Sequence, residues 1–105
     1  MEFPNEMQKL RTMLTEMGVQ WEDKSTIYTE EQILKTMREC RVSRKYADSS
    51  MWRTHFTYKG YFFSVIYGYG SYGYYDGKLE CMVGGKEPEG SMTAGDVLRR
   101  MEDIA

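Results

Sequence analysis

The sequence WRTHFTYKGYFFSVIY, residues 52–67, decides the fold of this chain. Its first half, 52–58, puts aromatic rings on one face and polar side chains on the other, which predicts a strand with one face on a core. Lys59-Gly60 can form a two-residue turn. Residues 61–67 then read as a second strand with apolar groups on both faces. We expect that strand to be central and covered on both sides, or to be an edge that a partner uses.

Further strands are predicted on both sides of this hairpin. Downstream, residues 79–83 alternate between apolar and polar side chains after the turn signal Asp76-Gly77. Upstream, residues 19–21 alternate briefly and can add a short strand. Residues 41–50 and 84–90 lack periodicity and are interpreted as loops. The pattern predicts an antiparallel β-meander of three to four strands.

Three segments combine helical apolar spacing with capping residues at their start. The expected capping pairs are Asn5 with Gln8, Thr29 with Gln32, and Thr93 with Asp96. The middle helix has an expected buried stripe of Ile33, Leu34, Met37 and Cys40. We therefore expect one α+β domain over residues 1–105, with the N-terminal, middle and C-terminal helices packed on one face of the sheet.

Residues 68–73, GYGSYG, spell the phosphate-binding fingerprint G-x-G-x-x-G. A dinucleotide site needs a helix that opens at the third glycine, so that its N–H groups meet the pyrophosphate. Here strand and turn residues follow instead. A kinase-type glycine loop needs further catalytic and metal-binding segments that a chain of 105 residues cannot hold. We interpret the stretch as a hairpin rich in tyrosine and glycine.

Residues 58–77 hold seven of the nine tyrosines. Tyrosine supplies rigid amphipathic contact area, as recognition surfaces require. The candidate binding residues here are Tyr67, Tyr69, Tyr72, Tyr74 and Tyr75, of which the last four are expected to be exposed. The alternative is that the rings pack across strands as ordinary pairs.

Charge is unevenly spread along the chain. Residues 35–59 carry seven basic and two acidic side chains, whereas both flanks are acidic and the net charge is −2. Four basic residues of this segment are candidates for binding phosphate or an acidic partner: Arg41, Arg44, Lys45 and Arg53. The alternative is a solvated face that the acidic flanks compensate.

Several chemistries are not expected. The single histidine, His55, is predicted on a strand, and no zinc-type spacing or nucleophile motif is present. We therefore expect no enzyme, no cofactor and no metal site. Cys40 and Cys81 are interpreted as two buried reduced thiols, with a disulfide as the alternative.

The sequence also bears on location and assembly. No apolar run approaches the roughly 18 residues that span a bilayer, and the polar N-terminus MEFPNEMQKL is unlike a secretory signal. We expect a cytoplasmic protein without a membrane partner. Strands 52–58 or 78–83 can expose an edge, so a homodimer through a sheet edge is a further expectation.

The C-terminal half, with Ser64-Val65-Ile66, Ser71-Tyr72-Gly73 and Gly77-Lys78-Leu79-Glu80, resembles small proteins carried by bacteriophages and prophages. Gly18-Val19-Gln20-Trp21 and the stretch from Met92 to Leu98 extend the resemblance. It implies a mobile-element accessory protein acting in the cytoplasm of a host cell. Many such proteins block a defence system, as anti-CRISPR proteins do, by binding without catalysis.

Three functions follow as hypotheses. The leading one is binding and inhibition of a host protein or protein complex. The second is a small-nucleotide sponge, in which tyrosines stack on a base while the basic 35–59 segment holds phosphate. The third is binding of nucleic acid through that segment, although a pI of about 5.4 counts against it.

Overall fold

The computed structural model describes residues 3–104 and has an α+β architecture. Its elements are α1 (Asn5–Glu16), β1 (Trp21–Asp23), α2 (Glu30–Cys40), α3 (Arg44–Ala47), β2 (Met51–Tyr58), β3 (Tyr61–Gly68), a 3-10 turn η1 (Tyr74–Asp76), β4 (Leu79–Val83), β5 (Glu89–Met92) and α4 (Ala94–Asp103). The five strands form one antiparallel meander in the order β1-β2-β3-β4-β5.

The predicted central hairpin is confirmed. β2 pairs with β3 along its whole length, from Met51 opposite Gly68 to Tyr58 opposite Tyr61. The sheet has five strands where three to four were expected, and the strand without any predicted counterpart is β5, which begins inside the stretch interpreted as a loop. The short first strand lies at 21–23 rather than 19–21. β2 and β4, expected to offer an edge, are interior; the edges are the short strands β1 and β5.

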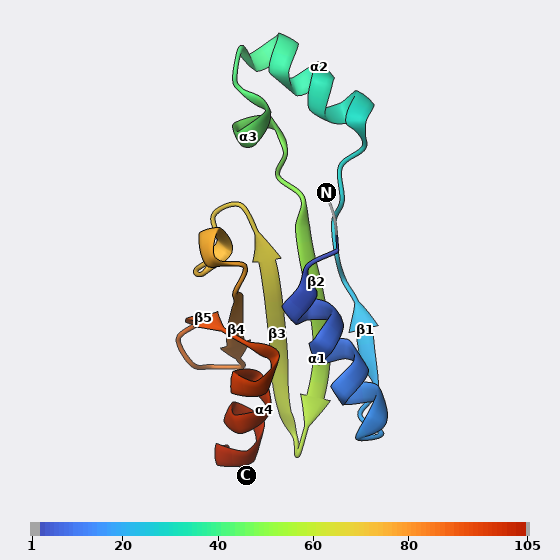
Figure 1. Ribbon diagram of the computed structural model, residues 1–105, viewed down its shortest axis with the longest axis vertical. Coiled ribbons are helices and arrows are strands. Elements are labelled where there is room, and N and C mark those ends of the chain that lie inside the picture. Colours follow the sequence, from blue (N-terminus) through green and yellow to red (C-terminus); the bar gives the residue numbers. More distant parts are fainter. Residues whose placement is uncertain (1–2, 105) are drawn as a thin grey trace.

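Two helices cover one face of the sheet, as expected. Figure 1 shows α1 and α4 side by side in front of the strands. Met7, Leu10 and Leu14 of α1 are fully buried, and they meet Phe63 of β3 in one continuous core. The capping boxes at Thr29 and Thr93 are both formed. The first helix differs, because Pro4 precedes it and Asn5 is already helical, so its side chain caps nothing.

The middle helix does not pack on the sheet, which corrects that part of the prediction. α2 and α3 form an arm beyond one end of the strands, and the molecule is 48 Å long but only 24 Å and 22 Å across (Figure 1). In α2 only Ile33 is buried, and Leu34 is 39% exposed. The arm is held at its base by the N–H of Tyr28, which donates to the Ser50 hydroxyl (2.9 Å).

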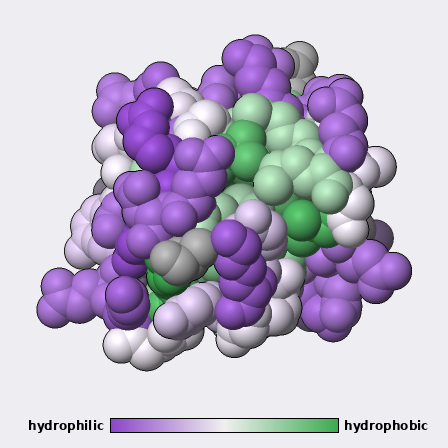
Figure 2. All heavy atoms as spheres, turned by 90° about the horizontal axis from the view of Figure 1, so that it is seen from below, coloured by the Kyte–Doolittle hydropathy of each residue, from purple (hydrophilic) through white to green (hydrophobic). Residues whose placement is uncertain are grey.

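At the end of the molecule opposite the arm, some apolar side chains are exposed. Figure 2 looks onto this end and shows an apolar area framed by polar side chains. Met17, which directly follows α1, is exposed although its spacing continues the apolar face of that helix. None of the helices within residues 3–104 is long and apolar enough to cross a membrane.

The two cysteines are both free thiols in different surroundings. Cys81 is buried in β4, as predicted, and burial raises its pKa to about 12. Cys40 is exposed at the end of α2, against the prediction. We expect a thiol reagent at pH about 8 to modify one cysteine quickly in the native protein and the second only after denaturation, because the thiolate is the reactive form. Cys40→Ser should abolish the fast reaction; two fast thiols in the wild type would contradict the burial of Cys81.

Candidate functional site

The predicted tyrosine hairpin is an ordered loop, residues 69–78, between β3 and β4. It turns at Ser71, whose hydroxyl donates to the Gly68 carbonyl (2.7 Å) and accepts from the Gly68 N–H (3.1 Å). The Tyr67 hydroxyl donates to the Tyr74 carbonyl (2.9 Å) and ties the loop to β3. Gly73 has φ 98°, and a Cβ there would lie 2.8 Å from the Ser91 backbone, so this position requires glycine.

Aromatic rings from the loop and from α3 meet in one cluster. Tyr69 contacts Tyr74 at 5.8 Å between ring centroids, and Tyr74 contacts Tyr75 at 5.2 Å. Tyr46, on α3, packs edge-on against Tyr69 at 5.7 Å. Tyr67 lies beneath, 5.3 Å from Tyr74, where burial raises its pKa. The loop and the arm therefore share one aromatic surface.

A lysine joins the two halves of this cluster. The Lys45 ammonium lies 5.3 Å from the ring centroid of Tyr69 and 5.1 Å from that of Tyr75, within cation–π range. Hydrogen bonding with the Tyr75 hydroxyl raises the pKa of Lys45, and hydrogen bonding with Tyr46 raises the pKa of Tyr69. We call Lys45, Tyr46, Tyr69, Tyr74 and Tyr75 the tyrosine platform.

Comparisons with protein families, curated proteins and solved structures find no match for this chain. What the tyrosine platform can do follows from its own side chains. Tyr75 is 75% exposed and Tyr46 is 62% exposed, so both present ring surface to solvent. Tyr69 and Tyr74, expected to be exposed, are half-buried and serve as the support beneath them.

The other predicted binding residues lie away from the tyrosine platform. Tyr72 is exposed on the β5 side of its loop, where its N–H donates to the Glu80 carboxylate (2.9 Å). Arg44 forms a two-point ion pair with Glu30 that holds α3 against α2. Arg41 is exposed in the turn after α2, with φ 55°.

Arg53 is separated most clearly from the other candidates. It lies on β2, and its guanidinium donates to the Lys24 carbonyl (3.2 Å).

Tyr46, in contrast, belongs to the tyrosine platform but was not predicted from the sequence. Tyr46 lies inside 41–50, a stretch without periodicity, so the sequence pattern does not predict the short helix α3. The one local feature that indicates this helix is Ser43, a residue type favoured before a helix, directly before RKYA.

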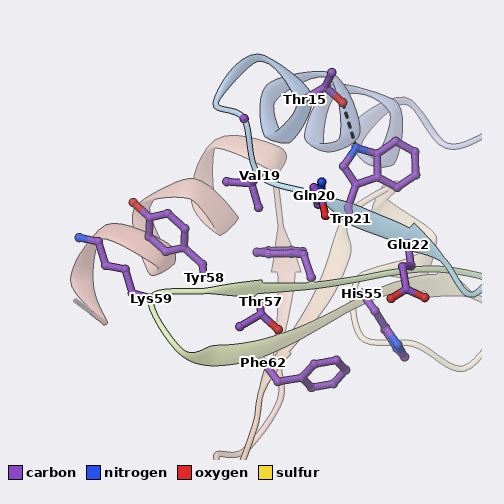
Figure 3. A pocket seen from close by; sticks show the side chains of 12 residues that line it. Thr15, Val19, Gln20, Trp21, Glu22, His55, Thr57, Tyr58, Lys59 and Phe62 are labelled. Carbon is purple, nitrogen blue, oxygen red and sulfur yellow. Dashed lines mark hydrogen bonds between the residues drawn. The ribbon is translucent and has the colours of Figure 1, made fainter.

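Apart from the tyrosine platform, a groove lies at the edge of the sheet where β1 begins. Figure 3 shows it, with Trp21 and Tyr58 on the helix side of the strands and His55 and Phe62 on the other side. It is an open groove of about 870 Å³. The Trp21 indole N–H donates to the Thr15 hydroxyl (2.9 Å). Burial, followed by the charges of Arg53 and Lys24, lowers the pKa of His55. Among residues 3–104, no three metal-ligating side chains lie together.

Proposed function

We propose that this protein is a non-catalytic binding protein that engages another protein through the tyrosine platform. The observation that carries the proposal is the position of Lys45 between Tyr69 and Tyr75. This contact joins the arm to the β3–β4 loop and leaves the rings of Tyr46 and Tyr75 exposed on a supported surface. Rigid exposed tyrosines lose little entropy on binding, which favours recognition.

Charge indicates the chemistry of the partner. Residues 30–48, which form the arm, carry five basic and four acidic side chains. The remainder of the chain carries nine basic and twelve acidic ones. The arm is thus weakly basic and the rest of the molecule is acidic, so an acidic protein surface fits the arm better than the rest of the molecule. We propose a host protein or protein complex as the partner and its inhibition by surface occupancy as the effect.

An anti-defence role is part of the proposal and is supported by the resemblance to prophage proteins alone. It can be tested by expressing the chain in bacterial strains that each carry one defence system and infecting them with a sensitive phage. We expect plating to be restored in one strain. Equal plating in every strain, with and without the chain, would contradict the role but leave the binding proposal open.

The tyrosine platform itself is tested by paired alanine variants. The partner is first captured from a host lysate on the immobilised chain and identified by mass spectrometry. The double variant Tyr46→Ala/Tyr75→Ala is expected to weaken binding to this partner by at least about tenfold, because exposed anchor rings dominate interface energies. Tyr61→Ala is the matched control, since Tyr61 is 41% exposed at the far end of β3 and should leave affinity unchanged. Titration calorimetry measures affinity, and thermal melts verify folding. Equal losses of affinity in the Tyr46/Tyr75 variant and in Tyr61→Ala, or unchanged affinity in both variants, would exclude the tyrosine platform as the contact.

Nucleotide binding is the second candidate, favoured by the exposed Tyr75 ring beside the Lys45 ammonium. A base could stack on the ring while the cation neutralises phosphate. Calorimetry against linear and cyclic nucleotides, and retention on heparin at low salt for nucleic acid, would detect it. Binding that Tyr75→Ala abolishes would favour this candidate over a protein partner.

A further inference from the structure

The strands have a second face that neither α1 nor α4 covers. Side chains on β2, β3 and β4 alternate, so those beside the core residues point to the opposite side. The open sheet face is formed chiefly by Arg53, His55, Phe62, Ile66, Glu80 and Met82. Phe62 is 44% exposed and Met82 is 40% exposed. Figure 3 shows His55 and Phe62 pointing away from the helices, where their rings meet at 5.0 Å.

The register places opposite charges symmetrically on this face. Ile66, on the central strand β3, pairs with Arg53 of β2 on one side and with Glu80 of β4 on the other. The cation and the anion therefore lie in one row, each about 4.8 Å from β3. Phe62 lies four residues from Ile66 along β3, on the same face, and places a second apolar group on the same central line.

Both charged side chains are already oriented by local hydrogen bonds. The Arg53 guanidinium donates to the Lys24 carbonyl (3.2 Å) and keeps further N–H groups free, because one such bond uses one of its five donors. The Glu80 carboxylate accepts the Tyr72 N–H (2.9 Å) through one oxygen and keeps the second. Side chains that are held in place lose less entropy when they bind.

We propose that a second copy of this chain packs its open sheet face against this one, related by a two-fold axis that runs along β3. Rotation about that axis brings β2 opposite β4 of the second copy. Arg53 then faces Glu80 of the second copy, and this contact occurs twice. Ile66 and Phe62 meet their own counterparts on the axis, at the roughly 10 Å separation of aligned sheets.

The charge pattern favours a second copy over an unrelated protein, since opposite signs occupy positions that the two-fold axis exchanges. Five strands about 4.8 Å apart and about 24 Å long give a plan area of at most roughly 600 Å². A standard interface buries about 800 Å² on each partner. Small interfaces are typical of transient association, so we expect a reversible dimer. Because the two-fold axis runs along β3, the arms of the two copies would extend in the same direction.

Sedimentation equilibrium from about 1 μM to about 500 μM tests the proposal. The mass is expected to rise from 12.4 kDa toward twice that value. Arg53→Glu and Glu80→Arg should each weaken the dimer at least about tenfold, because each brings like charges together. The double variant restores opposite signs and should recover wild-type affinity.

Two further variants keep the test decisive. Arg99→Glu makes the same charge change on the exposed side of α4 and should leave the dimer intact. Phe62→Arg brings two cations together on the axis, so it should disrupt the dimer without depending on Glu80, which also supports the Tyr72 loop. A monomer at every concentration, equal effects of Arg53→Glu and Arg99→Glu, or no recovery in the double variant would each overturn the proposal. Thermal melts exclude unfolded variants.

Discussion

Phe63→Ala is expected to lower the free energy of unfolding by about 3–5 kcal/mol, a large part of the stability of a domain this small. Phe63 is fully buried in β3, the central strand of the sheet, and its ring stacks on Phe56 at 4.8 Å. β3 is hydrogen-bonded to β2 and to β4, so its backbone cannot move inward to fill the space that the lost ring leaves. Urea unfolding at pH about 7 measures the loss.

The neighbouring residue supplies the control. Phe62→Ala removes the same ring from the same strand, but on the open sheet face. At protein concentrations where the chain is monomeric, we expect it to cost less than about 1 kcal/mol, because an exposed ring loses little burial. Comparable costs at 62 and 63 would mean that both faces of β3 are covered in the monomer, which contradicts the arrangement of α1 and α4.

The difference between these two residues also explains which parts of the sheet are predictable. Alternation at 52–67 identifies two strands and their register, because side-chain direction repeats every second residue. It does not say which face a helix covers when both carry apolar groups, as at 61–67. β5 carries no such signal. Its residues EGSM include one large apolar side chain, and Ser91 has φ 55°, so pairing with β4 decides its conformation.

The middle helix shows the same limit at a larger scale. Its apolar stripe and capping box predict α2 correctly, because both are local properties. A stripe indicates that a face can be buried but not what buries it, and Leu34 and Cys40 remain exposed in the arm. The packing of α2 depends on how the chain leaves β1 and returns to β2, a tertiary property.

The sequence predicted the loop side of the tyrosine platform and Lys45, but not Tyr46 or the contact between them. The density of tyrosine in 58–77 is a property of the sequence, and it indicates Tyr69, Tyr74 and Tyr75. Their contact with Lys45 and Tyr46 joins segments more than twenty residues apart in the sequence. The composition of one segment cannot predict such a contact. Arg53 shows the converse, because it belongs to the basic segment 35–59 in sequence but lies on the open sheet face, away from Lys45.

A buried cation provides the second large effect. Arg11 of α1 lies in the core, where its Nε donates to the Thr54 hydroxyl (2.8 Å). Its Nη2 donates to the Asp23 carboxylate and to the Arg53 carbonyl, both at 3.1 Å. The guanidinium also lies 4.8 Å from the Trp21 ring centroid. This one side chain therefore links α1 to β1 and β2, and its bond to Thr54 is buried from water.

Thr54→Val keeps the shape of the side chain but removes the acceptor, so it leaves a buried cationic donor unpaired at an expected cost of about 2–3 kcal/mol. Arg11→Met keeps the stem that packs on Trp21 and removes the charge, at an expected cost of about 1–3 kcal/mol. The double variant replaces both partners with apolar groups, and its cost should fall short of the sum by at least about 1 kcal/mol. Urea unfolding of the four proteins measures this coupling. Costs that add within about 0.5 kcal/mol would mean that the Arg11–Thr54 bond itself contributes nothing and that Arg11 acts through its bonds to Asp23 and the Arg53 carbonyl and through its ring contacts.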